Sequence, residues 1–184
     1  MVRKVITSLV SIFLLSSNLW AAKPDRWVTQ YDDFISRIRT DLNIAKPIFI
    51  LIVSKYESDV QIRTAEDRSE SCWKIVFHVI EIYGPYYKSL ESEEIKAVVA
   101  HEAEHIKELE KISCLKNRLA PSERNRIEED IRADTLAARY IDPVIVKSAI
   151  QKSIKRHSPL ARFPGMDDRM GNLDRLIRER KQSK

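Results

Sequence analysis

Residues 92–105 read SEEIKAVVAHEAEH, and this stretch determines how the rest of the chain is interpreted. Its apolar residues recur three and four positions apart, which predicts an amphipathic helix. Ser92 is the expected N-cap, and Glu93 and Glu94 in the first turn suit the positive end of the helix dipole. The apolar stripe continues to Ile112, so the helix should be long.

The same stretch contains the pattern H-E-x-x-H, formed by His101, Glu102 and His105. Residues four apart share one face of a helix, so both imidazoles can bind one Zn²⁺, and Glu102 can accept a proton from a water beside it. The alternative is an accidental string on a solvated helix rich in Glu and Lys. On the helical wheel the three residues fall within the apolar stripe, whereas Glu104 falls on the opposite side. An unpartnered buried carboxylate would cost several kcal/mol, which favours a metal site.

A second helix, predicted from residue 121 to about residue 142, supplies a third ligand. Asp130 and Asp134 lie four residues apart, on or beside its buried stripe. Asp130 is the candidate ligand, and Asp134 would hydrogen-bond a ligand histidine and fix its tautomer. The alternative is that these carboxylates cap a helix or pair with an arginine such as Arg169. We therefore expect one Zn²⁺ per chain, held by two histidines and one aspartate.

Residues 92–105 also resemble the active-site helix of the HtpX-like gluzincin metallopeptidases. In that family a strand precedes this helix and a second motif, E-x-x-A-D, follows on a later helix. Residues 130–134 read DIRAD and are similar to that motif, with Asp130 in place of the Glu. The resemblance covers roughly residues 73–176. It implies a zincin-like core in which the motif residues hold zinc and Glu102 is the general base.

The rest of the chain predicts an α+β fold, in which a small antiparallel or mixed sheet packs on a mainly helical core. Residues 65–71 are expected to form a polar loop. The strand segment 78–83 is the expected sheet edge, where a substrate backbone would add as a further strand. Strands are expected over 47–53, 60–64 and 73–83, and further helices over 25–39, from 143 onward and over 167–181.

The first 22 residues have the pattern of a secretory signal peptide. Arg3 and Lys4 precede a short apolar run over residues 5–15, and the small residues Ala21 and Ala22 follow. This order predicts cleavage after export, which leaves residues 23–184 as a single periplasmic or secreted domain. The alternative is an uncleaved membrane anchor, although the apolar run is short for a spanning helix.

Export makes the cysteine pair informative. The chain has two cysteines, Cys72 before a predicted strand and Cys114 at the end of the predicted active-site helix. The strand and the helix have similar predicted lengths, so both cysteines would reach the same end of the fold if the helix packs back along the sheet. We expect a disulfide in an oxidising compartment, the alternative being two free thiols.

Composition excludes other classes of function. The 184 residues include only three glycines, none close to another, so no glycine-rich phosphate-binding loop is present. The net charge is +5, and Arg3 and Lys4 of the predicted signal peptide contribute two of those charges. The remaining net charge is small, and the charged residues are of both signs, so the composition does not indicate a nucleic-acid partner.

Together these features predict an exported zinc endopeptidase that acts on a protein or peptide substrate and has no membrane span once the signal is removed. Zn²⁺ would activate water, and Glu102 would accept its proton. Tyr140, His157 and Arg169 are the candidates to stabilise the transition state. The second hypothesis is a zinc-stabilised envelope binding or assembly factor without turnover, in which Asp130 would close the metal site.

Overall fold

The computed structural model describes residues 25–55, 57–67, 74–112, 123–157 and 165–183. The predicted signal peptide and both cysteines of the predicted disulfide lie outside these residues. Within them, no helix combines the length and the apolar composition needed to cross a bilayer.

The described residues form an α+β fold with a four-stranded mixed sheet, which confirms the predicted class. The strand order is β1-β2-β4-β3. The β1–β2 and β3–β4 pairs are antiparallel, and the central β2–β4 pair is parallel. The strands are β1 (Arg26–Val28), β2 (Ile48–Val53), β3 (Val60–Asp67) and β4 (Lys74–Tyr83).

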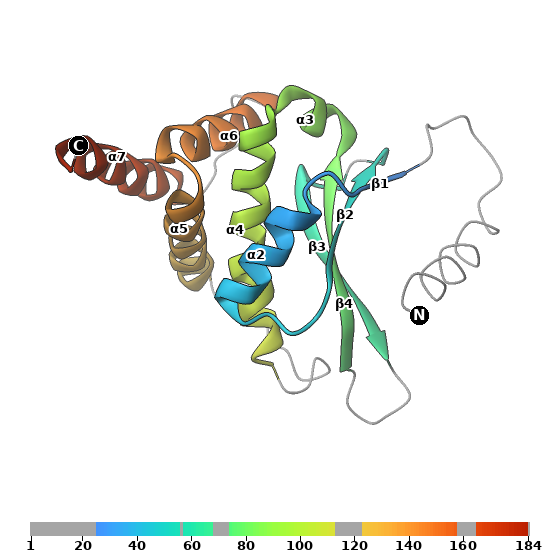
Figure 1. Ribbon diagram of the computed structural model, residues 1–184. Coiled ribbons are helices and arrows are strands. Elements are labelled where there is room, and N and C mark those ends of the chain that lie inside the picture. Colours follow the sequence, from blue (N-terminus) through green and yellow to red (C-terminus); the bar gives the residue numbers. More distant parts are fainter. Residues whose placement is uncertain (1–24, 56, 68–73, 113–122, 158–164, 184) are drawn as a thin grey trace.

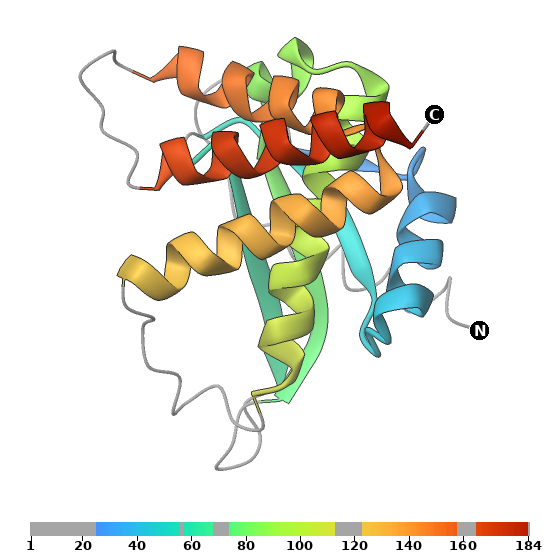
Figure 2. The same ribbon diagram turned by 90° about the vertical axis from the view of Figure 1, so that its left-hand side faces the viewer.

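Six helices are seen in the described part of the chain, and they lie on one side of the sheet (Figure 1). α2 and α4 lie next to the sheet, α5 and α6 pack on the far side of α4, and α7 packs on α5 and α6 (Figure 2). α4 is therefore the central helix of the molecule. The helices are α2 (Asp32–Leu42), α3 (Gly84–Ser89), α4 (Ser92–Glu110), α5 (Glu123–Tyr140), α6 (Pro143–Arg156) and α7 (Met166–Gln182).

The hydrophobic core lies between the sheet and α4. Ile80 and Ile82 of β4 and Ile106 of α4 are fully buried. Alanines on α4, among them Ala100 and Ala103, are also fully buried, and such small side chains allow neighbouring helices to approach closely. α4 is thus packed against the sheet on one side and against neighbouring helices on the other.

The N-terminal end of α4 is fixed to α6. Glu91 is the N-cap and forms a reciprocal capping box with Glu94, so the N-cap is not Ser92 as predicted. Glu94 is 4% exposed and accepts hydrogen bonds from Ser148 Oγ and Lys152 Nζ, both at 2.6 Å. The side chain that closes the capping box therefore also joins the two helices.

The C-terminal end of α4 is fixed to the sheet and to the loop before β2. Glu110 accepts the backbone N–H groups of Ala45 and Lys46, each at 2.8 Å. Its Oε1 also lies 3.2 Å from Nε2 of His78, a β4 residue that is fully buried. Both ends of α4 are thus attached, and the H-E-x-x-H residues lie between them.

Two expectations about local structure were wrong. The segment 25–39 was predicted as one helix, but it begins with the three-residue strand β1, and α2 starts only at Asp32. Residues 65–67 were predicted in a loop, but they extend β3 to Asp67 through an irregularity at Ala65 and Glu66. Both errors concern short extended segments, whose pairing with β2 and β4 stabilises them.

The predicted sheet edge was also wrong. β4, which contains residues 78–83, lies between β2 and β3 and uses both of its edges for pairing. The edge strands are β1 and β3. An added strand would therefore have to pair with β3 or β1, and β3 is the edge strand that begins beside the cavity described below.

Candidate metal centre

Two histidines on α4 and one aspartate on α5 bring three ligand atoms together. Nε2 of His101 and Nε2 of His105 lie 3.1 Å apart. Oδ1 of Asp130 lies 3.3 Å from Nε2 of His105 and 3.8 Å from Nε2 of His101. Zn²⁺ ligands at about 2.0–2.2 Å in tetrahedral geometry lie roughly 3.3–3.6 Å from one another. The three atoms thus have the separations that a single metal ion requires, and the predicted ligand set can hold one.

The orientation of His101 is set by Asp134. Nδ1 of His101 lies 2.8 Å from Oδ1 of Asp134, whose side chain is fully buried. An ionised carboxylate can only accept a hydrogen bond, so Nδ1 carries the proton and donates it. Nε2 of His101 is then left with a lone pair directed toward the other two ligand atoms. Asp134 therefore lies where the sequence placed it, behind a ligand histidine.

Arg169 of α7 contacts both aspartates. Its Nε and Nη2 donate to the two oxygens of Asp134, at 2.8 and 2.9 Å. Its Nη1 donates to Oδ2 of Asp130 at 3.0 Å. The sequence left open whether Asp130 binds a metal or pairs with an arginine. The structure allows both, because the two oxygens of Asp130 face different partners.

The electrostatics of this cluster favour a cation. Burial would raise the pKa of Asp130, but the hydrogen bond from His105 and the charge of Arg169 hold it below its ordinary value. Burial would lower the pKa of His105, but Asp130 and Glu102 raise it above its ordinary value. The negative charge that stabilises a proton on His105 would equally stabilise a metal ion at that nitrogen.

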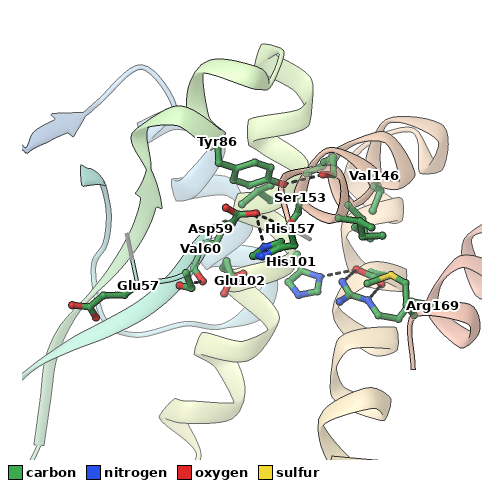
Figure 3. A pocket seen from close by; sticks show the side chains of 18 residues that line it. Glu57, Asp59, Val60, Tyr86, His101, Glu102, Val146, Ser153, His157 and Arg169 are labelled. Carbon is green, nitrogen blue, oxygen red and sulfur yellow. Dashed lines mark hydrogen bonds and ion pairs between the residues drawn. The ribbon is translucent and has the colours of Figure 1, made fainter. Parts of the chain in front are cut away.

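A cavity of about 390 Å³ opens beside His101 (Figure 3). His101 and Glu102 form part of its wall, and Val98 of α4 and Val146 of α6 contribute apolar surface. Among the residues that the structure describes, no hydrogen bond or ion pair holds the Glu102 carboxylate. Glu102 thus lies at the wall of a partly apolar cavity without a hydrogen-bond or ion-pair partner among the described residues.

The same cavity contains a polar cluster that the sequence analysis did not identify. Asp59, in the residue before β3, is 6% exposed and accepts hydrogen bonds from Ser153 Oγ at 2.7 Å and Arg156 Nε at 3.2 Å. Nε2 of His157 lies 3.3 Å from Oδ2 of Asp59, the oxygen that also accepts the hydrogen bond from Ser153. Figure 3 shows Asp59, Ser153 and His157 together at the cavity. No sequence pattern marked Asp59, because its partners are about 100 positions away.

Other predicted positions lie elsewhere. Tyr140 donates its hydroxyl to Oδ2 of Asp41 and packs edge-to-face on Phe34, and it is not part of the cavity wall. Glu104 was expected on the solvent side of α4 but is 8% exposed, with Lys107 Nζ 3.2 Å from its Oε2. The helical wheel failed there because α4 has neighbours on several sides.

The site is thus two imidazoles, a carboxylate oriented by an arginine, a second carboxylate behind one imidazole, and an unpaired glutamate at a cavity. Comparisons of this chain with protein-family models, with curated proteins and with solved structures gave no match.

Proposed function

We propose that this protein is a zinc-dependent endopeptidase of the gluzincin type, as the resemblance to the HtpX-like family suggests, with a zincin-like core. One observation carries the proposal. The ligand atoms of His101, His105 and Asp130 converge, and His101 also lines a cavity in which Glu102 has no hydrogen-bond or ion-pair partner among the described residues. Export rests on residues 1–22 alone and is part of the same proposal.

In the proposed mechanism, metal binding and proton transfer would be carried out by different residues. His101, His105 and Asp130 would bind the ion, and Asp134 would keep the proton of His101 on Nδ1. When bound, Zn²⁺ polarises a carbonyl group and lowers the pKa of water. Glu102 would accept the proton of the attacking water on its carboxylate and pass it to the leaving amine.

His157 is the candidate to stabilise the oxyanion of the transition state. Of the three side chains considered, Tyr140 is not part of the cavity wall, and Arg169 uses three of its N–H groups on carboxylates. His157 lines the cavity together with His101 and Glu102, and Asp59 lies within 3.3 Å of its Nε2. An imidazole N–H at this cavity could donate a hydrogen bond to a developing oxyanion.

The edge strand β3 is the candidate to align the substrate. Val60, its first residue, lines the cavity, and β3 pairs with β4 on one side. A peptide that adds to the other side of β3 would have its backbone held by main-chain hydrogen bonds and would run past the cavity. This role replaces the one that residues 78–83 of β4 were expected to have.

The second candidate is a zinc-stabilised binding or assembly factor without turnover. The ligand set joins α4 to α5, so an ion would fasten two helices even if no reaction followed. Glu102 favours the enzyme, because a purely structural site gains nothing from an unpaired carboxylate at a cavity.

The test combines metal content with hydrolysis in three proteins. Wild type, Glu102→Gln and the control Glu108→Gln would be purified, analysed for zinc, and assayed on casein and on a peptide library. Glu108 lies on the same helix, where it pairs with Lys111 at the surface. We expect about one zinc in each, and a loss of roughly 10²–10⁴-fold in rate in Glu102→Gln only. Tight zinc binding with no hydrolysis by wild type would support the binding factor. Equal rates in wild type and Glu102→Gln would contradict the mechanism.

A further inference from the structure

The guanidinium group of Arg169 fixes which oxygen of Asp130 faces the metal site. Nη1 of Arg169 holds Oδ2 of Asp130 at 3.0 Å, while Oδ1 of Asp130 lies 3.3 Å from Nε2 of His105. Arg169 is itself fixed in position, because its Nε and Nη2 donate hydrogen bonds to the two oxygens of Asp134, whose side chain is fully buried. A planar guanidinium held by two hydrogen bonds has little rotational freedom. The direction of its third hydrogen bond, to Asp130, is therefore fixed.

The position of Arg169 depends on the start of α7. Gly165 is the N-cap of α7 and adopts φ = 73°, and its carbonyl accepts the backbone N–H of Arg169 at 3.0 Å. Arg169 is thus one turn into the helix, with its side chain 14% exposed. α7 therefore reaches the metal site through this one side chain, although it contributes no ligand atom of its own.

The choice of oxygen has a chemical consequence. A carboxylate can bind a cation through one oxygen or through both. Catalytic zinc sites keep one coordination position for water, whereas structural sites are closed by protein ligands. If both oxygens of Asp130 bound the metal ion, the second oxygen would occupy the coordination position that water needs. Within the described part of the chain, Arg169 is the partner that holds Oδ2 of Asp130 away.

We propose that Arg169 is a positioning residue that restricts Asp130 to a single metal-facing oxygen and so keeps the site open to water. This inference rests on the proposed metal site but not on turnover. Charge alone does not explain the arrangement, because a cation next to a metal site opposes metal binding. The fork geometry, which lysine lacks, is the property that the site uses.

The experiment compares Arg169→Lys and Arg169→Ala with wild type and with the control Arg175→Lys. Arg175 lies on the same helix, is exposed, and contacts Glu179 and Asn172. Each protein would be titrated with Zn²⁺, and the absorption spectrum of its Co²⁺ form would be recorded, because that spectrum reports the number of ligands. Circular dichroism of the metal-free proteins would check folding.

We expect Arg169→Lys, which keeps the charge, to bind zinc roughly 10–100-fold more weakly, and both Arg169 variants to show a changed Co²⁺ spectrum, with Arg175→Lys unchanged. Millimolar guanidinium should restore the wild-type spectrum to Arg169→Ala, which a loss of folding would not permit. Wild-type affinity and spectrum in Arg169→Lys would overturn the inference, as would a failure of guanidinium to rescue folded Arg169→Ala. Absence of hydrolysis by zinc-loaded wild type would count against the proposed enzyme only, because these readouts do not depend on turnover.

Discussion

Replacing Glu110 with alanine should destabilise the protein by about 2–3 kcal/mol. The largest part comes from His78, which is fully buried and whose Nδ1 has no partner among the described residues. Without Glu110, neither ring nitrogen would be satisfied there, and an unsatisfied buried polar group costs about 1–3 kcal/mol. The N–H groups of Ala45 and Lys46 also lose their acceptor. These two residues are exposed, so water can replace most of that contribution.

Urea unfolding followed by circular dichroism at pH 7.5 measures the effect. The matched control is Glu108→Ala, two residues away on the same helix, where the carboxylate meets only Lys111 at the surface. A surface pair of this kind is worth less than about 0.5 kcal/mol. If Glu110→Ala and Glu108→Ala lose the same stability, the attachment of α4 through Glu110 does not contribute as the structure indicates.

Three further perturbations test other parts of the structure. Burial holds the pKa of His78 below its ordinary value of 6.5, so the unfolded chain takes up the proton first. The contribution of His78 to stability should therefore be complete above about pH 6.5 and fall at lower pH, and urea midpoints should fall more between pH 7.5 and 5.5 in wild type than in His78→Gln. In Gly165→Ala the left-handed backbone costs about 1–2 kcal/mol, and the new Cβ would lie 2.4 Å from Ile127 Cγ2, so a measured loss under 0.5 kcal/mol would be incompatible with this geometry. His157→Ala should lower kcat by roughly 10²–10³-fold with zinc content unchanged, whereas a parallel loss of zinc would assign His157 to metal binding.

Periodicity along α4 and along α5 was sufficient to predict which residues form the candidate metal site. His101, His105, Asp130 and Asp134 lie where the wheel placed them, because residues four apart share a face in any α-helix. The helix expected from residue 143 onward was also confirmed, and Asp142 caps it through a local hydrogen bond to the backbone N–H of Val144. Features decided by neighbours in sequence were therefore predictable.

Features decided by tertiary neighbours were not predictable. The order of the strands depends on pairing between segments far apart, so β4 was taken for an edge when it is central. Glu104 is buried because several elements surround α4, which a two-sided wheel does not represent. Asp59 meets Ser153, Arg156 and His157 only after α6 has packed against the start of β3. Each of these facts requires the folded arrangement.

The proposed metal ligands and the arginine that supports one of them lie on separate helices, and this arrangement bears on when a metal could bind. His101 and His105 share α4, but Asp130 belongs to α5, and the arginine that orients it belongs to α7. A nascent or unfolded chain offers at most the two imidazoles, which hold a metal weakly. In the proposed site, tight metal binding would therefore require that α5 has packed on α4 and that Arg169 of α7 contacts Asp130. The ion that such a site takes up would then depend on the metal supply of the compartment in which folding is completed, and not on that of the compartment in which the chain is made.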